Sequence, residues 1–342
     1  MENKRWKVLV NGMGNIGTTL ANLLLRYQAQ LNIETVYVAK RTLQAWNLAE
    51  RKILVQQGAV ICTYQPAESV LLVAEVLPVV DYIFEATANG VGLANLPAYK
   101  QLPNLKGSSA QGSEKGYGIP FMSGVNDKVI SGKSFVNVVS CNTHGSAALL
   151  KTFTGQNLEN LANADVVVVR RSEDIGNHQR LVSANVVARH LDPSVGTHHS
   201  MDVIDMYKTL GINCPLTSSD ITTPSQLMHS VRFNITFKRP LTESIEVLIK
   251  KNPFMATTQK FDSNIVFELG RRYGFNGRIF SHAIVLTGNL LVTENSVKGW
   301  AFVPQEGNSL LSTLHAYILQ MNLPNGTRVF DQIKADLLRS EW

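Results

Sequence analysis

The sequence predicts a two-domain α/β protein, with a parallel sheet in its first half and an α+β domain with a mixed, largely antiparallel sheet after it. In the first half, short β-branched apolar runs alternate with longer stretches whose apolar residues recur at helical spacing. This alternation is typical of βαβ units with parallel strands. In the second half, runs such as 230–237 alternate apolar and polar residues as antiparallel strands do. A chain of 342 residues is long enough for two separate cores.

Individual elements follow from the same periodicities. In the first half we expect strands at 7–12, 34–40, 79–87 and 134–140, and helices at 18–30 and 43–58. In the second half we expect strands at 165–171, 230–237 and 282–294, and helices at 147–153, 242–251, 308–321 and 328–340. Thr242 is the expected N-cap of the helix at 242–251.

Composition and charge narrow the class of protein. Three widely spaced cysteines form neither a disulfide framework nor a CxxC metal site, which favours a reducing compartment. The N-terminal apolar stretch is too short for a signal peptide, and no apolar run reaches membrane-spanning length. We therefore expect a cytoplasmic protein with no membrane partner. The net charge of +6 suits phosphorylated metabolites, and no Lys/Arg-rich run with interleaved aromatics points to nucleic acid.

A glycine pattern precedes the first expected helix. In "VNGMGNIG", Gly12, Gly14 and Gly17 lie directly after a strand and before a helix, which is the context of a dinucleotide-binding Rossmann domain. Gly12 allows a tight turn, Gly14 lets the backbone approach a pyrophosphate, and Gly17 allows close helix packing. The helix N-terminus then faces the phosphates.

The end of the second strand bears on the choice of cofactor. NAD-selective sites usually have Asp or Glu there, to bind the ribose 2′-hydroxyl. This chain has Lys40 and Arg41 instead, which suit a 2′-phosphate, so NADP should bind at least as well as NAD. The alternative is that both are solvated surface charges.

A single cysteine follows the apolar run in "VVSCNTHG". A thiol at the start of a helix lies where the helix dipole and unpaired N–H groups favour the thiolate. The alternative is a buried, inert thiol. A dinucleotide domain that leads into a second domain at a cysteine suggests thiol-dependent aldehyde oxidation, with hydride leaving to a nicotinamide.

Several stretches together resemble the archaeal-type (type II) phosphorylating glyceraldehyde-3-phosphate dehydrogenases. They are "VNGMGNIG", "FEAT", "AQGSEK", "VVSCNTHG", "VVVVRRSED", "THHSMDV", "QLMHS" and "FVPQEG", in family order between residues 7 and 306. The combination of "SCNTHG" with downstream "VVRR" and "HH" is specific, whereas no single stretch is.

The resemblance implies a role for each matching residue. Cys141 is the implied nucleophile, and His229 is the implied general base that deprotonates it and assists hydride transfer. The implied substrate contacts are Ser140, Asn142, His198 and His199, the two histidines binding the substrate phosphate. Besides the three glycines, the implied cofactor contacts are Asn15, Ile16, Gly112, Arg171 and Gln305.

The chain departs from the family pattern at several positions. The family's run Leu-Met-His-Met-His loses its second histidine, with Ser230 and Val231 in its place. His144 stands where threonine is common, and Ser113 stands for a glycine. Ser200 and Met201 replace a Gly-Pro pair, and the segment 174–193 diverges.

The other histidines, cysteines and arginines are read more plainly. In an extended backbone, His198 and His199 would point to opposite sides. No carboxylate or cysteine lies near them at ligand spacing, so we expect no metal. Arg170 and Arg171 end a strand, where they either solvate that edge or hold a phosphate or the cofactor. We expect no chemistry at Cys62, Cys214, His178, His190, His282 and His315.

These observations predict a domain organisation and a reaction. Residues 1–139 form a dinucleotide-binding domain on which 306–342 pack back, and 140–305 form a catalytic domain. The resemblance implies phosphorylating oxidation of glyceraldehyde 3-phosphate to 1,3-bisphosphoglycerate with NADP or NAD, in glycolysis or gluconeogenesis, by a homotetramer. The alternatives are a related semialdehyde or acyl-phosphate dehydrogenase, a non-catalytic cofactor-binding relative, or a basic nucleotide-binding protein with salt-dependent RNA binding.

Overall fold

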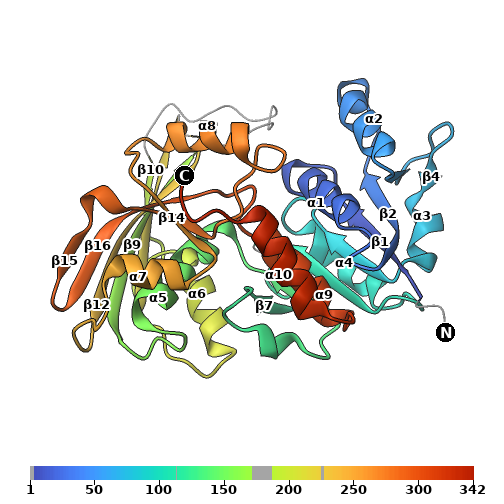
Figure 1. Ribbon diagram of the computed structural model, residues 1–342. Helices are drawn as coiled ribbons and strands as arrows, with labels where there is room; N and C mark the ends of the chain where they lie inside the picture. The colour runs from blue at the N-terminus through green and yellow to red at the C-terminus, as the bar shows by residue number, and fades with distance from the viewer. Residues whose placement is uncertain (1–3, 113, 172–186, 225–226) are drawn as a thin grey trace. The chain divides into compact units, whose positions relative to one another are not determined.

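The computed structural model describes residues 4–112, 114–171, 187–224 and 227–342 (Figure 1). They form two compact units. Unit 1 lies within Met1–Ser123, Ile130–Val138 and Leu310–Ala335, and unit 2 within Gly124–Val129, Val139–Ser309 and Asp336–Trp342. None of the described helices combines the length and apolar character needed to span a bilayer. We describe each unit by itself.

Unit 1 is built on an eight-stranded sheet in which every neighbouring pair is parallel, which confirms the predicted parallel sheet. Its order is β4-β3-β2-β1-β5-β6-β8-β7. The strands are β1 (Trp6–Asn11), β2 (Ile33–Lys40), β3 (Val60–Thr63), β4 (Leu71–Leu72), β5 (Tyr82–Glu85), β6 (Gly107–Gln111), β7 (Ile119–Phe121) and β8 (Phe135–Val138). The order reverses direction between β1 and β5, which places a topological switch point at their carboxyl ends.

Helices cover both faces of this sheet. They are α1 (Asn15–Arg26), α2 (Leu48–Gln56), α3 (Val73–Val76), α4 (Val91–Tyr99), α9 (Leu310–Gln320) and α10 (Gly326–Leu337). Neighbouring residues of β8 enter two different cores. Phe135 packs with Tyr99 of α4, whereas Val136 packs with Ala316 of α9. A parallel sheet buried on both faces explains why its strands read as continuous apolar runs.

The turn between β1 and α1 depends on its glycines. Gly12 has a φ of +123°, and a Cβ there would lie 2.5 Å from the Ala86 carbonyl oxygen. A Cβ on Gly17 would lie 1.9 Å from the Gly12 carbonyl oxygen. Gly14 differs, because a Cβ there would meet nothing within 4 Å. Gly12 and Gly17 are therefore required by the fold, and Gly14 leaves open space above the turn.

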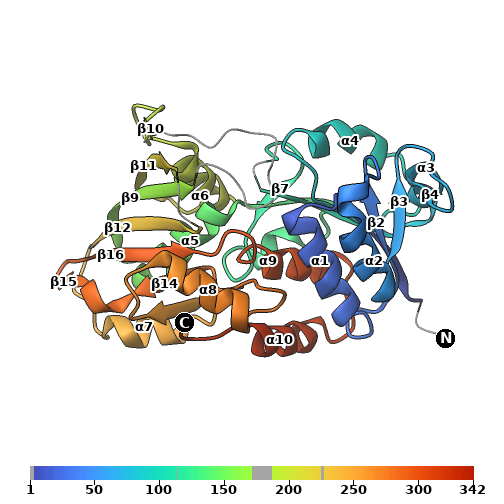
Figure 2. The same cartoon turned by 90° about the horizontal axis from the view of Figure 1, so that it is seen from above.

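Unit 2 contains the mixed, largely antiparallel sheet that the sequence predicts, in the order β10-β11-β9-β12-β16-β14-β13 with β15 paired to β16. The strands are β9 (Leu161–Arg171), β10 (Val187–Arg189), β11 (Leu216–Thr223), β12 (His229–Phe237), β13 (Met255–Thr258), β14 (Ala283–Leu286), β15 (Leu291–Thr293) and β16 (Ser296–Val303). Only β11–β9 and β13–β14 are parallel among the described pairs. Figure 2 shows β9, β12 and β16 side by side, with α5 against them.

The two faces of this sheet carry different helices. The helices of unit 2 are α5 (Cys141–Thr154), α6 (His198–Lys208), α7 (Ile245–Lys251) and α8 (Ser263–Tyr273). A Cβ on Gly145 of α5 would lie 2.7 Å from Cγ2 of Val303, so α5 packs closely on one face. Phe302, the neighbouring residue, clusters instead with Val266 and Phe267 of α8. Because side chains alternate along a strand, α5 and α8 lie on opposite faces.

Some expected boundaries were wrong. The helix expected at 242–251 begins at Ile245, and its N-cap is Ser244, whose hydroxyl accepts from the Val247 backbone N–H, rather than Thr242. The strand expected at 282–294 divides into β14 and β15 around a 3₁₀ turn at Thr287–Asn289. The strand expected from residue 79 begins at Tyr82, because a 3₁₀ turn with proline in its first turn, Leu77–Val79, precedes it. The helices α3, α4, α6 and α8 were not predicted.

We expect Gly17→Ala to destabilise the protein by roughly 1–3 kcal/mol, because the new methyl group overlaps the Gly12 carbonyl. Gly14→Ala is the matched control, and it should unfold at nearly the wild-type denaturant midpoint because its methyl group meets open space. Urea unfolding of the three proteins measures this. Equal midpoints for both variants would contradict the packing described above.

Candidate functional site

Cys141 is the first residue of α5, directly after its N-cap Ser140. The Ser140 hydroxyl oxygen accepts from the Thr143 backbone N–H at 3.4 Å and lies 2.9 Å from the Thr143 hydroxyl. Cys141 is half-buried, whereas Cys62 and Cys214 are 0% and 3% exposed. Burial raises the pKa of each of these two thiols to about 12, so both stay protonated near neutral pH. Among the three cysteines, only Cys141 combines exposure with the position at a helix start that favours a thiolate.

An asparagine that the sequence analysis missed holds the backbone of the first turn. The fully buried Asn308 donates from Nδ2 to the Cys141 carbonyl oxygen at 2.9 Å and to the His282 carbonyl oxygen at 3.0 Å. Asn142 is 3% exposed, and its Oδ1 has no hydrogen-bond partner in the described part of the chain. The backbone around the thiol is thus fixed, and one adjacent amide oxygen remains available.

The strand register determines which side chains share a face with α5. Phe233 of β12 stacks on Phe153 of α5 with ring centroids 5.8 Å apart. Odd-numbered residues of β12 therefore face α5, and His229 is one of them. Opposite Phe233, the antiparallel neighbour β9 places Val166, so the even-numbered residues of β9 face α5, including Arg170.

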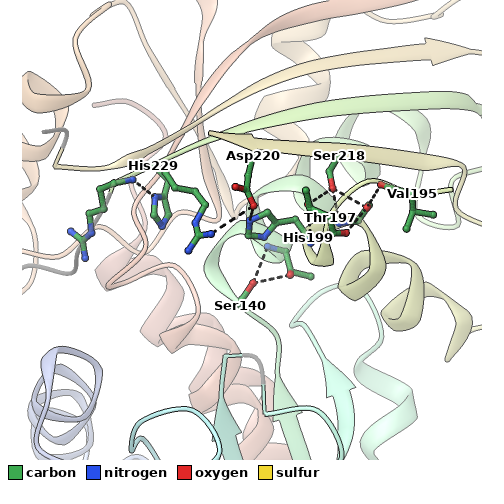
Figure 3. Close-up of polar contacts among 11 residues, drawn as sticks. Ser140, Val195, Thr197, His199, Ser218, Asp220 and His229 are labelled. Carbon is green, nitrogen blue, oxygen red and sulfur yellow. Dashed lines mark hydrogen bonds and ion pairs between the residues drawn. The ribbon is translucent and has the colours of Figure 1, made fainter. Parts of the chain in front are cut away.

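The same face continues onto β11. Val168 of β9 is in register with Asp220 of β11, so Asp220 also lies on the α5 face. Its carboxylate Oδ2 lies 3.7 Å from Arg170 Nη1 and 3.7 Å from His199 Nε2 (Figure 3). No sequence pattern pointed to Asp220, because only the pairing of β11 with β9 in the sheet brings it to this face.

His198 and His199 are the first two residues of α6, so they do not have the extended backbone in which they would point to opposite sides. The N-cap Thr197 accepts from the His199 backbone N–H at 3.3 Å, and the two ring centroids are 3.9 Å apart. His199 is 3% exposed, and burial together with the nearby His198, Arg170 and His229 lowers its pKa to about 2. The Asp220 carboxylate is too distant for a hydrogen bond, so burial prevails and the ring is neutral near pH 7. A helix N-terminus favours anions there.

His229 has a defined tautomer. Its Nδ1 accepts from the Arg171 backbone N–H at 3.3 Å, and its own backbone N–H donates to Gln305 Oε1 at 3.1 Å. A backbone N–H can only donate, so Nδ1 carries no proton and the neutral ring is protonated at Nε2. The His229 side chain can therefore donate a hydrogen bond from Nε2.

Arg171 lies on the opposite face of the sheet from Arg170. It forms an ion pair with Glu306 at 2.9 Å and donates to the Leu227 carbonyl oxygen at 3.2 Å. Glu306 also pairs with Arg278 at 2.7 Å. Arg171, Arg278, Gln305 and Glu306 line one pocket. The structure thus brings together Arg171 and Gln305, two implied cofactor contacts, and adds the charges of Glu306 and Arg278, which sequence reasoning missed.

The remaining expected cofactor residues lie in unit 1, where several strands end. Gly12, Gly14, Asn15, Ile16 and Gly17 form the turn after β1 and the first residues of α1. Lys40 is the last residue of β2, and its Nζ lies 5.2 Å from the centroid of the Trp46 ring. Arg41 follows and is exposed. Gly112 follows β6 with a φ of +77°. All are at the carboxyl edge of the parallel sheet, where such sheets bind ligands.

Two other expectations lie outside what the structure describes. They concern His178 and Ser113, together with the larger part of the divergent segment 174–193.

Curated proteins resemble the chain over most of its length. A glyceraldehyde-3-phosphate dehydrogenase from Methanoregula boonei is 28% identical over 268 residues, which cover 74% of this chain and 73% of that protein. Proteins of the same name from Saccharolobus solfataricus and Saccharolobus islandicus are 28% and 29% identical over 279 residues, covering 77% of this chain and 76% of each relative. These dehydrogenases are homologues of the chain. They support the glyceraldehyde-3-phosphate dehydrogenase family at modest identity, while no family model matches the sequence.

Two buried histidines lie beneath the first turn of α5. His144 is 0% exposed, and its Nδ1 lies 3.0 Å from the Ser140 carbonyl oxygen. Its ring is 4.9 Å from that of His282, which stacks on Phe254 at 4.3 Å. Burial lowers the pKa of His144 to about 4 and that of His282 well below its usual value. Both rings are therefore uncharged at neutral pH, and each is held in place by aromatic packing.

This arrangement predicts a pH-dependent stability. The unfolded chain binds protons at these histidines below about pH 6.5, whereas folded His144 does so only near pH 4, so stability is complete above 6.5 and falls as the pH drops. Between roughly pH 7 and pH 5, each of these two buried histidines should lower the free energy of unfolding by about 2 kcal/mol. His144→Thr introduces the residue that is common in the resembling family. It should remove the contribution of His144 to the pH dependence of the free energy of unfolding, measured by chemical unfolding. The exposed His190→Thr is the control, and an unchanged slope in His144→Thr would disprove this assignment.

Proposed function

We propose that the chain is an NAD(P)-dependent oxidoreductase that oxidises glyceraldehyde 3-phosphate to 1,3-bisphosphoglycerate, as a member of the archaeal-type phosphorylating branch. One observation carries the proposal. The half-buried Cys141 is the first residue of the buried helix α5, and the sheet face that packs against this helix bears His229, Arg170 and Asp220. The names of the homologues supply the substrate. Unit 1 is the proposed dinucleotide-binding domain and unit 2 the proposed catalytic domain.

The carboxyl edge of the unit 1 sheet suits a dinucleotide. The exposed Gly14 leaves open space where any Cβ would project, at the N-terminus of α1. Backbone N–H groups there would hold the pyrophosphate, and Lys40 and Arg41 would hold the 2′-phosphate of NADP. A bound nicotinamide would supply the hydride acceptor. Arg171 and Gln305, which line one pocket of unit 2, are the proposed further cofactor contacts.

The proposed chemistry proceeds through Cys141. The thiolate attacks the aldehyde carbon, and the carbonyl π electrons move to oxygen, which leaves a thiohemiacetal alkoxide. The alkoxide re-forms the C=O bond as hydride departs, which yields a thioester. An oxygen of inorganic phosphate then attacks the thioester carbon and the thiolate leaves, so the nucleophile is regenerated. Because Cys141 enters as a thiolate, this sequence needs no separate base at the aldehyde.

His229 then has a different proposed role from that of a general base. Taking a proton at Nε2 would require the other tautomer, with Nδ1–H directed at the Arg171 backbone N–H. In the tautomer that this hydrogen bond requires, Nε2–H is a donor for the developing alkoxide, as in an oxyanion hole. The substrate phosphate would lie at the α6 N-terminus against His198 and His199, with Ser140 and Asn142 close to the carbonyl end of the substrate.

The wider assignments follow from the same homology. We propose a cytoplasmic homotetramer with a role in glycolysis or gluconeogenesis, acting on small molecules.

The reaction should appear as phosphate-dependent reduction of NADP or NAD. We expect glyceraldehyde 3-phosphate to give NADPH or NADH absorbance only with phosphate or arsenate present, and Cys141→Ser to abolish it. Cys214→Ser, a buried thiol in the same unit, is the control and should retain activity. Reduction without phosphate dependence would indicate a non-phosphorylating enzyme. No reduction in a protein that still binds NADP would overturn the proposal in favour of another aldehyde or a non-catalytic role.

The role of His229 can be tested by two substitutions. If Nε2–H acts as a donor, His229→Ala should lower kcat by about 10²–10³-fold, the typical loss of one oxyanion donor. His229→Gln keeps an N–H donor and should lose considerably less, with the pH–rate profile unchanged in shape. If both variants lose equally and the acidic limb of the profile disappears, His229 is a general base after all.

A further inference from the structure

The side chains of His198, His199 and Asp220 converge on the α5 face of the unit 2 sheet. The two histidines come from the first turn of α6, and the carboxylate comes from the middle of β11. One ligand-type atom from each lies within 4.8 Å of the others, and no other trio of His, Cys, Asp or Glu among the described residues meets this condition. Figure 3 shows the His199 ring directed at the Asp220 carboxylate.

Two of these side chains have buried polar atoms that form no hydrogen bond with any residue that the structure describes. His199 is 3% exposed, and within the described chain neither ring nitrogen has a hydrogen-bond partner. Asp220 is 2% exposed, and its Oδ1 likewise lacks one there. A buried polar atom without a partner destabilises the folded state, so native proteins rarely retain three together without a ligand.

The donor set identifies the ligand. Two imidazoles and one carboxylate are the three protein ligands of an open zinc site, in which water or another ligand takes the fourth position. Bonds of about 2.0–2.2 Å to one ion place ligand atoms roughly 3.3–3.6 Å apart, so side-chain shifts of about 1 Å would close the site. We propose that His198, His199 and Asp220 bind one divalent transition-metal ion, with Zn²⁺ as the best-suited ion.

The surrounding charges leave room for this ion. Arg170 approaches the Asp220 carboxylate through Oδ2 at 3.7 Å, which leaves Oδ1 for the metal. His198 is half-buried and connects the otherwise buried cluster to solvent. A bound ion would occupy the two imidazoles that we propose for the substrate phosphate, so metal and substrate would exclude each other.

The test is titration of the full-length protein with Co²⁺, whose tetrahedral complexes absorb visible light. The titration is run in a Cys141→Ser background, because a thiolate is itself a strong metal ligand. We expect one Co²⁺ per chain, displaced by Zn²⁺. His199→Gln and Asp220→Asn should each weaken binding by at least the roughly 10- to 100-fold that follows loss of an outer-shell partner. The control His190→Gln, at an exposed histidine, should bind as the parent does.

The outcomes separate this site from the proposed dehydrogenase. The titration contains neither aldehyde nor dinucleotide, so it succeeds or fails independently of catalysis. If a buried variant does not fold, as seen by circular dichroism, the half-buried His198→Gln takes its place and should show the same loss. Absence of binding, or binding that survives all three substitutions, overturns the proposal.

Discussion

The site in unit 2 depends on the close packing of α5 against the second sheet. Gly145 allows this approach, because any larger residue would collide with Val303 of β16. One turn earlier, Asn308 ties the Cys141 carbonyl to the backbone at His282, just before β14. The backbone of the first turns of α5 is therefore held by the side chains of Val303 and Asn308. A nucleophile gains from such rigidity, because its attack geometry is set before substrate arrives.

The pleat of β9 divides two adjacent arginines between two environments. Arg170 faces α5 and Asp220, whereas Arg171 enters a buried charge network with Glu306 and Arg278. The Arg171 backbone N–H, in contrast, points along the sheet to His229 and selects its tautomer. The end of β9 thus places a cation on one face of the sheet and an ion pair on the other, and its backbone determines the tautomer of His229. The two arginines therefore have different surroundings: Arg170 lies beside Asp220, and Arg171 pairs with Glu306.

Neutral imidazoles dominate the polar chemistry of this face. Burial keeps His144, His199 and His282 uncharged, so the positive charge available for a phosphate comes from Arg170 and the α6 N-terminus. A neutral His199 ring has one N–H that can donate a hydrogen bond and one nitrogen that can bind a metal ion. An anion from a substrate and a cation from solution would both find partners in this cluster. The Asp220 carboxylate favours the cation over the anion, because it is negatively charged.

The sequence alone determined the local features of this protein. The parallel sheet, the mixed sheet, the glycine turn and the place of Cys141 after a strand were predictable, because each depends on residues close together in the chain. The positions of Asp220, Asn308 and Glu306 were not, because strand register and sheet order bring them to the site across long sequence separations. The helix that begins at His198, with Thr197 as its N-cap, was not predicted. Which face each arginine occupies, and which tautomer His229 adopts, were decided only by tertiary structure, since both follow from hydrogen bonds between neighbouring strands.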